Sequence, residues 1–114
     1  MKSDQFFKAD GGKPNPLLLE KGCPRALMAI NRVLDYGAQK YEAHSWQRVE
    51  VERYDAAARR HRISRDIGEE RDTESGLLHL AHEATNILFQ LEMKCREVGV
   101  DFNSFNPPPT DHKT

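Results

Sequence analysis

Apolar residues recur at three- and four-residue intervals over two long segments of this chain, and that spacing predicts α-helices. Pro24 is a favourable first helical residue, so we expect the first helix to run from Pro24 to Tyr41. Its apolar face comprises Ala26, Leu27, Ile30, Val33, Leu34, Gly37 and Tyr41.

The second apolar segment predicts the longest helix, from residue 74 or 75 to Glu97. Thr73 or Ser75 can cap its first turn, and Gly99 can end it. Its apolar face is broad and comprises Leu77, Leu80, Ala84, Ile87, Leu88, Leu91 and Val98. One partner helix cannot cover such an arc, so we expect copies of the chain to associate as a homo-oligomer. The alternative is a loosely packed monomer.

The segment between these two contains a third helix of unusual composition, which we expect from Arg53 to Ile67, with Gly68 ending it. Arginines crowd this helix and aliphatic residues are few. The charges point in all directions, which argues against contact with a nucleic-acid backbone. A loop from Glu42 to Val51 contains Trp46 and precedes the helix.

The two ends carry turn and extended signals. Residues 1–23 combine glycine, proline and asparagine with a short apolar anchor, and we expect them to be irregular. The tail from residue 100 contains Pro107-Pro108-Pro109 and should be extended and mobile. The prediction is therefore an all-α bundle with two long antiparallel helices, comprising one domain over residues 1–99 and a tail over residues 100–114.

Composition narrows the class of protein. A chain of 114 residues with a net charge of −1 is one domain without the basic excess of a nucleic-acid binder. Cys23 and Cys95 lack metal-site spacing and are expected to be free thiols in a reducing compartment. We see no secretory signal and no run of about 20 apolar residues, so we expect a cytoplasmic protein with no membrane partner.

Candidate chemistry lies on the polar side of the longest predicted helix. His79, His82, Glu83, Asn86 and Gln90 share one stripe, separate from the leucines. A solvated face would carry mostly lysine and glutamate, whereas imidazoles with a carboxylate and an amide are typical of a half-buried site for a metal or a polar ligand. The alternative is a set of surface or hydrogen-bonded core residues without further function.

An acidic turn leads directly into this stripe. Glu69 and Asp72 lie one helical turn apart, and oxygen ligands of this kind hold Mg²⁺ or Mn²⁺. A cationic group of Lys13, Lys40, Arg60 and His61 could hold phosphates that bridge to the metal. The alternative is a set of surface ion pairs worth about 0–1 kcal/mol each. Trp46 is either a core plug or a platform on which a nucleobase stacks.

These residues together resemble the family of N-terminal domains of phage dATP/dGTP diphosphohydrolases, over about residues 8–92. The motifs that carry the resemblance are Gly12-Lys13-Pro14, Gly37-Ala38-Gln39-Lys40-Tyr41, His44-Ser45-Trp46, Arg60-His61, Gly68-Glu69 with Asp72, Glu74-Ser75-Gly76, and His79-Leu80-Ala81-His82 with Asn86. The resemblance implies metal-dependent hydrolysis of a purine deoxynucleoside triphosphate to monophosphate and pyrophosphate, in the host cytoplasm if a phage encodes the chain. It also suggests kinship with all-α pyrophosphohydrolases, which hold Mg²⁺ on acidic helices.

With that resemblance, each candidate residue receives an expected role. The expected metal ligands for Mg²⁺ or Mn²⁺ are Glu69, Asp72, His79 and Glu83, and the expected catalytic residues are Glu69, His61 and His82. The expected purine-nucleotide contacts are Lys13, Lys40, Trp46, Arg60 and Asn86. Asn86 replaces the acid that the all-α enzymes carry at that position of the helix, so a protein that binds and sequesters a nucleotide without hydrolysis is the alternative.

Overall fold

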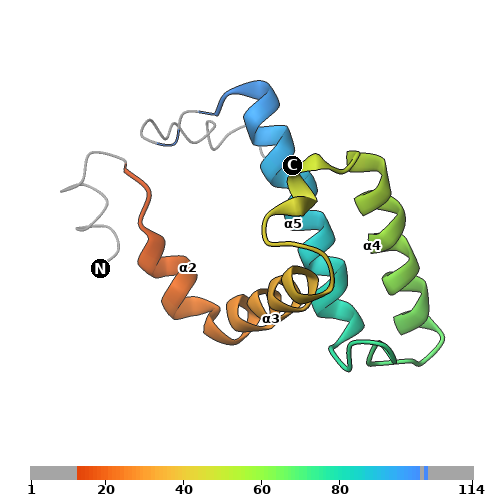
Figure 1. The fold of residues 1–114 in the computed structure, drawn as a ribbon. Helices are drawn as coiled ribbons and strands as arrows, with labels where there is room; N and C mark the ends of the chain where they lie inside the picture. Colours follow the sequence, from red (N-terminus) through yellow and green to blue (C-terminus); the bar gives the residue numbers. More distant parts are fainter. Residues whose placement is uncertain (1–12, 101, 103–114) are drawn as a thin grey trace, which may run out of the picture.

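Residues 13–100 and 102, which a computed structural model of the protein describes, contain four α-helices and one 3-10 helix (Figure 1). The α-helices are α2 (Pro16–Gly22), α3 (Pro24–Lys40), α4 (Val51–Asp66) and α5 (His79–Val98), and the 3-10 helix η1 (Ser45–Arg48) lies between α3 and α4. Among the described residues there are no β-strands, and one isolated antiparallel β-bridge joins Arg71 and Leu78. The predicted all-α fold is confirmed.

The first long helix begins at Pro24 as expected and ends one residue earlier, at Lys40. The expectation that residues 13–23 are irregular was wrong, because seven of them form α2. The Asn15 side chain accepts a hydrogen bond from the Leu17 amide at 3.1 Å, and Pro16 stands in the first turn, so both helix-start signals are present. Residues 1–12 lie outside the described part.

Helices α4 and α5 form the main packed pair and run antiparallel, side by side in Figure 1. Tyr54 near the start of α4 meets Phe89 in the second half of α5, with ring centroids 4.9 Å apart. His61, farther along α4, meets His82 near the start of α5, with centroids 4.6 Å apart. Helix α3 packs against α5 as well. The main antiparallel pair therefore includes the arginine-rich α4, whereas the two longest helices predicted from sequence correspond to α3 and α5.

The start of α5 differs from the prediction. The helix begins at His79 rather than at residue 74 or 75, and Leu78 precedes it without a side-chain cap. The polar groups that could have capped an earlier start are used inside the turn. The Asp72 carboxylate accepts a hydrogen bond from the Ser75 amide at 2.8 Å, and the Ser75 hydroxyl accepts one from the Leu77 amide at 3.2 Å.

The ends of α4 and α5 follow the glycine signals in the sequence. Gly68 has a φ of 102°, two residues after α4 ends at Asp66. Gly99 has a φ of 68° and closes α5, as expected. Beyond Gly99, the predicted tail of residues 100–114 lies outside the described part except at residues 100 and 102. None of the described helices has the length and apolar character that a membrane crossing requires.

Helix α5 turns its polar stripe inward and its apolar stripe outward. His79 and His82 are 3% and 7% exposed, whereas Leu80 and Leu91 are 53% and 57% exposed. Among the described residues, the buried hydrophobic side chains are Val33, Ala58 and Ala81. The reason lies in α4, which is short of aliphatic side chains and meets α5 with tyrosine, histidine and arginine.

Candidate functional site

Three potential metal ligands converge where α4, the following turn and the start of α5 meet. His61 comes from α4, Asp72 from the turn, and His79 is the first residue of α5. One ring nitrogen of each histidine and one carboxylate oxygen of Asp72 all lie within 4.8 Å of one another. His79 is buried, while the other two are half-buried and can be reached from solvent. Two imidazoles and a carboxylate form a donor set that suits a divalent metal.

Both nitrogens of His79 have partners. Nε2 lies 2.7 Å from a carboxylate oxygen of Glu69, and Nδ1 lies 2.8 Å from Nδ1 of His61. An ionised carboxylate only accepts hydrogen bonds, so the tautomer of His79 that fits this contact carries its proton on Nε2 and presents a lone pair at Nδ1. The His61 Nδ1–H is therefore the donor between the two rings.

His82 lies behind this group and completes a cluster of three histidines. Its ring stacks on that of His61 at an interplanar angle of 9°, and its Nε2 lies 2.7 Å from the Ser75 hydroxyl oxygen. Tyr36 of α3 meets His82 edge-on. Burial lowers the pKa of both His61 and His82, and the neighbouring imidazoles lower the pKa of His61 further. Both rings are therefore neutral at pH 7, and each neutral ring has one nitrogen with a lone pair that can accept a proton or a metal.

Asp72 stays ionised beside these imidazoles. Burial alone would raise its pKa, but hydrogen bonds from Ser75 and the nearby His82 and His61 outweigh burial, so the pKa lies below its ordinary value. The result is one carboxylate charge held next to two neutral rings. This arrangement favours a cation over an anion at the point where the three side chains meet.

Glu83 lies outside this convergent group. Its carboxylate accepts two hydrogen bonds from Arg65 of α4, at 2.8 and 3.1 Å, and its second oxygen is 3.8 Å from Arg62. The two guanidinium groups neutralise the carboxylate. Of the four expected metal ligands, the structure therefore brings Asp72 and His79 together, keeps Glu69 as a partner of His79, and pairs Glu83 with arginine.

The expected phosphate-binding cations are spread over the surface. Lys40 forms an ion pair with Glu74 at 2.7 Å, and that contact raises the pKa of Lys40 and ties it to the acidic turn. Lys13 and Arg60 are exposed, Arg60 beside His61 in the chain. The Asn86 amide, expected to contact nucleotide, donates instead to the His82 carbonyl at 2.7 Å.

Trp46 packs within an aromatic cluster, as a core plug does, and its role as a platform for a nucleobase stays a prediction. In η1, its ring stacks on Phe89 of α5 with centroids 4.3 Å apart and an interplanar angle of 9°. Tyr54 meets the same ring edge-on and donates its hydroxyl proton to the Trp46 carbonyl. Phe89 thus covers one face of the indole, and the aromatic cluster anchors η1 to the α4–α5 pair.

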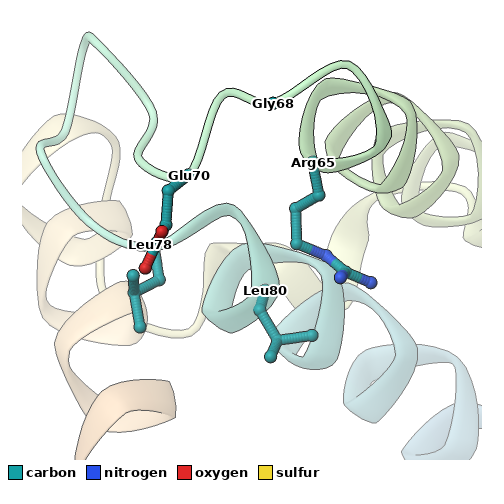
Figure 2. Close-up of a pocket in the computed structure, with 5 residues that line it drawn as sticks. All are labelled: Arg65, Gly68, Glu70, Leu78 and Leu80. Carbon is teal, nitrogen blue, oxygen red and sulfur yellow. The ribbon is translucent and has the colours of Figure 1, made fainter.

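A surface pocket of about 350 Å³ opens beside the start of α5, lined by Arg65, Gly68, Glu70, Leu78 and Leu80 (Figure 2). In Figure 2, Arg65 reaches down from α4 on one side and Glu70 from the turn on the other, with Leu80 on the helix between them. The pocket combines one cation, one anion and apolar surface. None of the three convergent ligands lines it, so it is separate from the His–Asp group.

Two contributors were missed by reasoning from sequence. Ser75 was considered as a helix cap and as part of a family motif but was given no role in the site, yet it holds both Asp72 and His82. Arg65 neutralises Glu83, although the two residues are 18 positions apart. No local pattern reveals such contacts, because they depend on how α4 pairs with α5.

Comparison with known proteins places this geometry in context. The family model described as dATP/dGTP diphosphohydrolase, N-terminal, matches residues 3–103. A protein of Salmonella phage PMBT28 named dATP/dGTP diphosphohydrolase is 37% identical over 83 residues. The alignment covers 73% of this chain and 28% of that relative, so the chain spans little more than a quarter of the relative's length. No solved structure matches the chain.

Proposed function

The chain belongs to the family of dATP/dGTP diphosphohydrolase N-terminal domains, and from that premise we propose that it hydrolyses purine deoxynucleoside triphosphates to monophosphate and pyrophosphate. The observation that carries the proposal is the convergence of His61, Asp72 and His79 at the start of α5. Two imidazoles and an ionised carboxylate at one point, with His61 and Asp72 only half-buried, suit a divalent metal that engages phosphate.

The residues present fit such a metal, with Mn²⁺ better matched than Mg²⁺ because two of the three donors are nitrogen. When bound, the metal would polarise the α-phosphate and position a water for attack. The rest of the catalytic work falls to side chains. Glu69 holds the His79 ring in place, and Asp72 supplies the negative charge that retains the cation.

His82 is the side chain best suited to move a proton in this reaction. It is neutral at pH 7 because burial lowers its pKa, and the Ser75 hydroxyl fixes the direction of its ring. His61 stacks on it and is similarly neutral. A neutral imidazole with a lowered pKa can accept a proton from an attacking water and return it to the leaving group.

Cationic side chains would neutralise the triphosphate. Lys40 lies at the edge of the acidic turn through its ion pair with Glu74, and a triphosphate would compete with that carboxylate for it. Exposed Arg60, and Lys13 at the start of the described chain, are further candidates. Because phosphoryl transfer depends mainly on positioning and electrostatics, this division of roles accounts for the chemistry.

A second candidate function is nucleotide binding without hydrolysis. The observation that favours it is the pairing of Glu83 with Arg65 and Arg62, which leaves the site with fewer acidic metal ligands than the sequence suggested. A metal and three phosphate-binding cations are sufficient for capture. In that case the chain would retain the triphosphate intact.

We also propose that the chain assembles as a homo-oligomer through α5. Leu80, Ile87, Leu91 and Val98 repeat along one stripe of the helix, and all are at least half exposed. A second copy in antiparallel orientation presents the same stripe and satisfies two-fold symmetry.

A panel of nucleotides tests the proposal. The pure chain is incubated with each deoxynucleoside and ribonucleoside triphosphate plus Mn²⁺ or Mg²⁺, and products and retained ligands are separated by chromatography. Conversion of dATP or dGTP to monophosphate and pyrophosphate supports hydrolysis. Retained, unaltered nucleotide supports the second candidate. The absence of both turnover and retained nucleotide would contradict both candidate functions.

A further inference from the structure

We infer that His61, His79 and Asp72 form a centre for a first-row transition metal such as Zn²⁺ or Co²⁺, in preference to Mg²⁺. This inference deepens the proposed function by naming the cofactor class, and it rests on that function for what the metal does but not for its binding. It also changes the set of metal ligands expected from sequence, because His61 is added as a ligand and Glu83 is no longer one.

The two histidines are nearly positioned for a shared metal. Their Nδ1 atoms lie 2.8 Å apart, which is hydrogen-bond distance. A tetrahedral metal with bonds of about 2.0–2.1 Å to nitrogen requires about 3.3 Å between its two nitrogen ligands. The pair must therefore open by about 0.5 Å, a movement within the reach of side-chain rotation in the half-buried His61.

The protonation states agree with metal binding. The Glu69 carboxylate holds the proton on Nε2 of His79, which leaves the Nδ1 lone pair aimed at His61. A carboxylate bonded to the far nitrogen of a ligating histidine is the usual outer partner of such a ligand. Binding requires only that His61 move its proton from Nδ1 to Nε2. Neither ring changes its charge, and two metal–nitrogen bonds replace one hydrogen bond.

The donor set determines the choice of metal. Mg²⁺ prefers an octahedral shell of oxygen ligands, whereas imidazole nitrogen suits Zn²⁺, Co²⁺ and Ni²⁺. The group supplies one carboxylate, and the buried acid of α5, Glu83, is already held by Arg65 and Arg62. Three protein ligands leave at least one position for water or a phosphate oxygen, as in catalytic zinc sites.

Titration with Co²⁺ in the absence of nucleotide tests the inference, because visible absorption of Co²⁺ reports coordination by protein nitrogen. The exposed thiol of Cys23 is removed first by Cys23→Ser, which also places a good capping residue before α3. We expect one Co²⁺ per chain, displaced by Zn²⁺ but not by a large excess of Mg²⁺. Calorimetry with Zn²⁺ gives the affinity independently of the spectrum.

Variants locate the bound ion. Asp72→Asn and His61→Gln should each weaken Co²⁺ binding at least tenfold, and Glu69→Gln should weaken it about 10- to 100-fold as an outer partner. His44→Asn is the control, since His44 is exposed, has a φ of 65° that asparagine tolerates, and lies outside the group. Circular dichroism checks that each variant is folded. If Asp72→Asn does not fold, the His61→Gln variant alone tests the location of the ion.

The outcomes separate the inference from the proposed function. Co²⁺ binding that survives Asp72→Asn and His61→Gln unchanged, or a Mg²⁺ affinity equal to that for Co²⁺, would overturn the metal centre. Tight Co²⁺ binding by a protein that turns over no nucleotide would support the metal centre and contradict the proposed hydrolase activity. Turnover that needs only Mg²⁺, with no Co²⁺ bound, would support the hydrolase activity and contradict the metal centre.

Discussion

Replacing Arg65 by methionine should destabilise the protein more than any change to a surface ion pair. Arg65 donates two hydrogen bonds to Glu83, and the Glu83 side chain is 12% exposed. Arg65→Met keeps a side chain of similar length and removes the charge, so the Glu83 carboxylate is left without its main partner.

The expected cost follows from the environment of the pair. Removing one partner of a buried ion pair costs about 3–5 kcal/mol. The Arg65 side chain is 30% exposed and Arg62 stands 3.8 Å from the other Glu83 oxygen, so water and Arg62 recover part of that loss. We therefore expect the free energy of unfolding to fall by about 2–3 kcal/mol, a large share of the stability of a small domain.

Urea unfolding at pH 7 measures the effect, with Arg59→Met as the matched control. Arg59 pairs with Asp55 on the exposed face of α4, where an ion pair is worth about 0.2–1 kcal/mol. Adding Glu83→Gln to Arg65→Met should restore part of the loss, because the stranded charge is gone. A cost below about 0.5 kcal/mol for Arg65→Met would show that Glu83 is well solvated and free to bind a metal, as the sequence alone suggested, and would refute the assignment to arginine.

Three further results are expected. Burial lowers the pKa of His61 and His82 below the ordinary 6.5, so the unfolded chain binds more protons than the folded protein in mildly acidic solution. The melting temperature should therefore fall as the pH drops through about 6.5 and below. A melting temperature that stays constant from pH 7.5 to 5 would contradict the burial of these two rings. Leu91→Glu should leave helicity intact by circular dichroism and convert the oligomer to a monomer by light scattering, whereas a monomeric parent chain would rule out the proposed assembly. Trp46→Ala removes the stack on Phe89 and should lower the free energy of unfolding in urea by about 2–3 kcal/mol. This is less than the cost of about 3–5 kcal/mol for a fully buried aromatic residue, because the indole is half-buried. An unchanged free energy of unfolding would contradict the packing role and favour a role for Trp46 as a platform for a nucleobase.

Local signals were sufficient for most of the helices. Pro24 and Gly99 marked helix ends that the structure confirms, and three-and-four spacing located α3 and α5. Helix α2 was missed because it has seven residues, too few for a periodic signal, although Asn15 and Pro16 are helix-start residues. The start of α5 was placed too early because its capping candidate, Ser75, bonds within the turn instead.

The candidate site was partly readable from sequence. Asp72 and His79 are close in the chain, so a turn between them was enough to bring them together. His61 joins them only because α4 runs back antiparallel along α5, and Arg65 reaches Glu83 for the same reason. The sequence also left the orientation of α5 open, since a helix with one polar and one apolar stripe can bury either. The polar stripe of α5 is the buried one because the helix that packs against it, α4, is lined with arginine and histidine.

The rate of pyrophosphate release from dGTP and dATP by Asp72→Asn tests the central claim most directly. The substitution keeps the shape of the side chain and an acceptor for the Ser75 amide, and removes only the charge. Asp66→Asn, an exposed change at the end of α4, is the control. We predict measurable release by the parent chain and the control at saturating metal, and at least a hundredfold loss in Asp72→Asn, or about 2.7 kcal/mol of barrier. Equal rates in all three proteins would contradict the account.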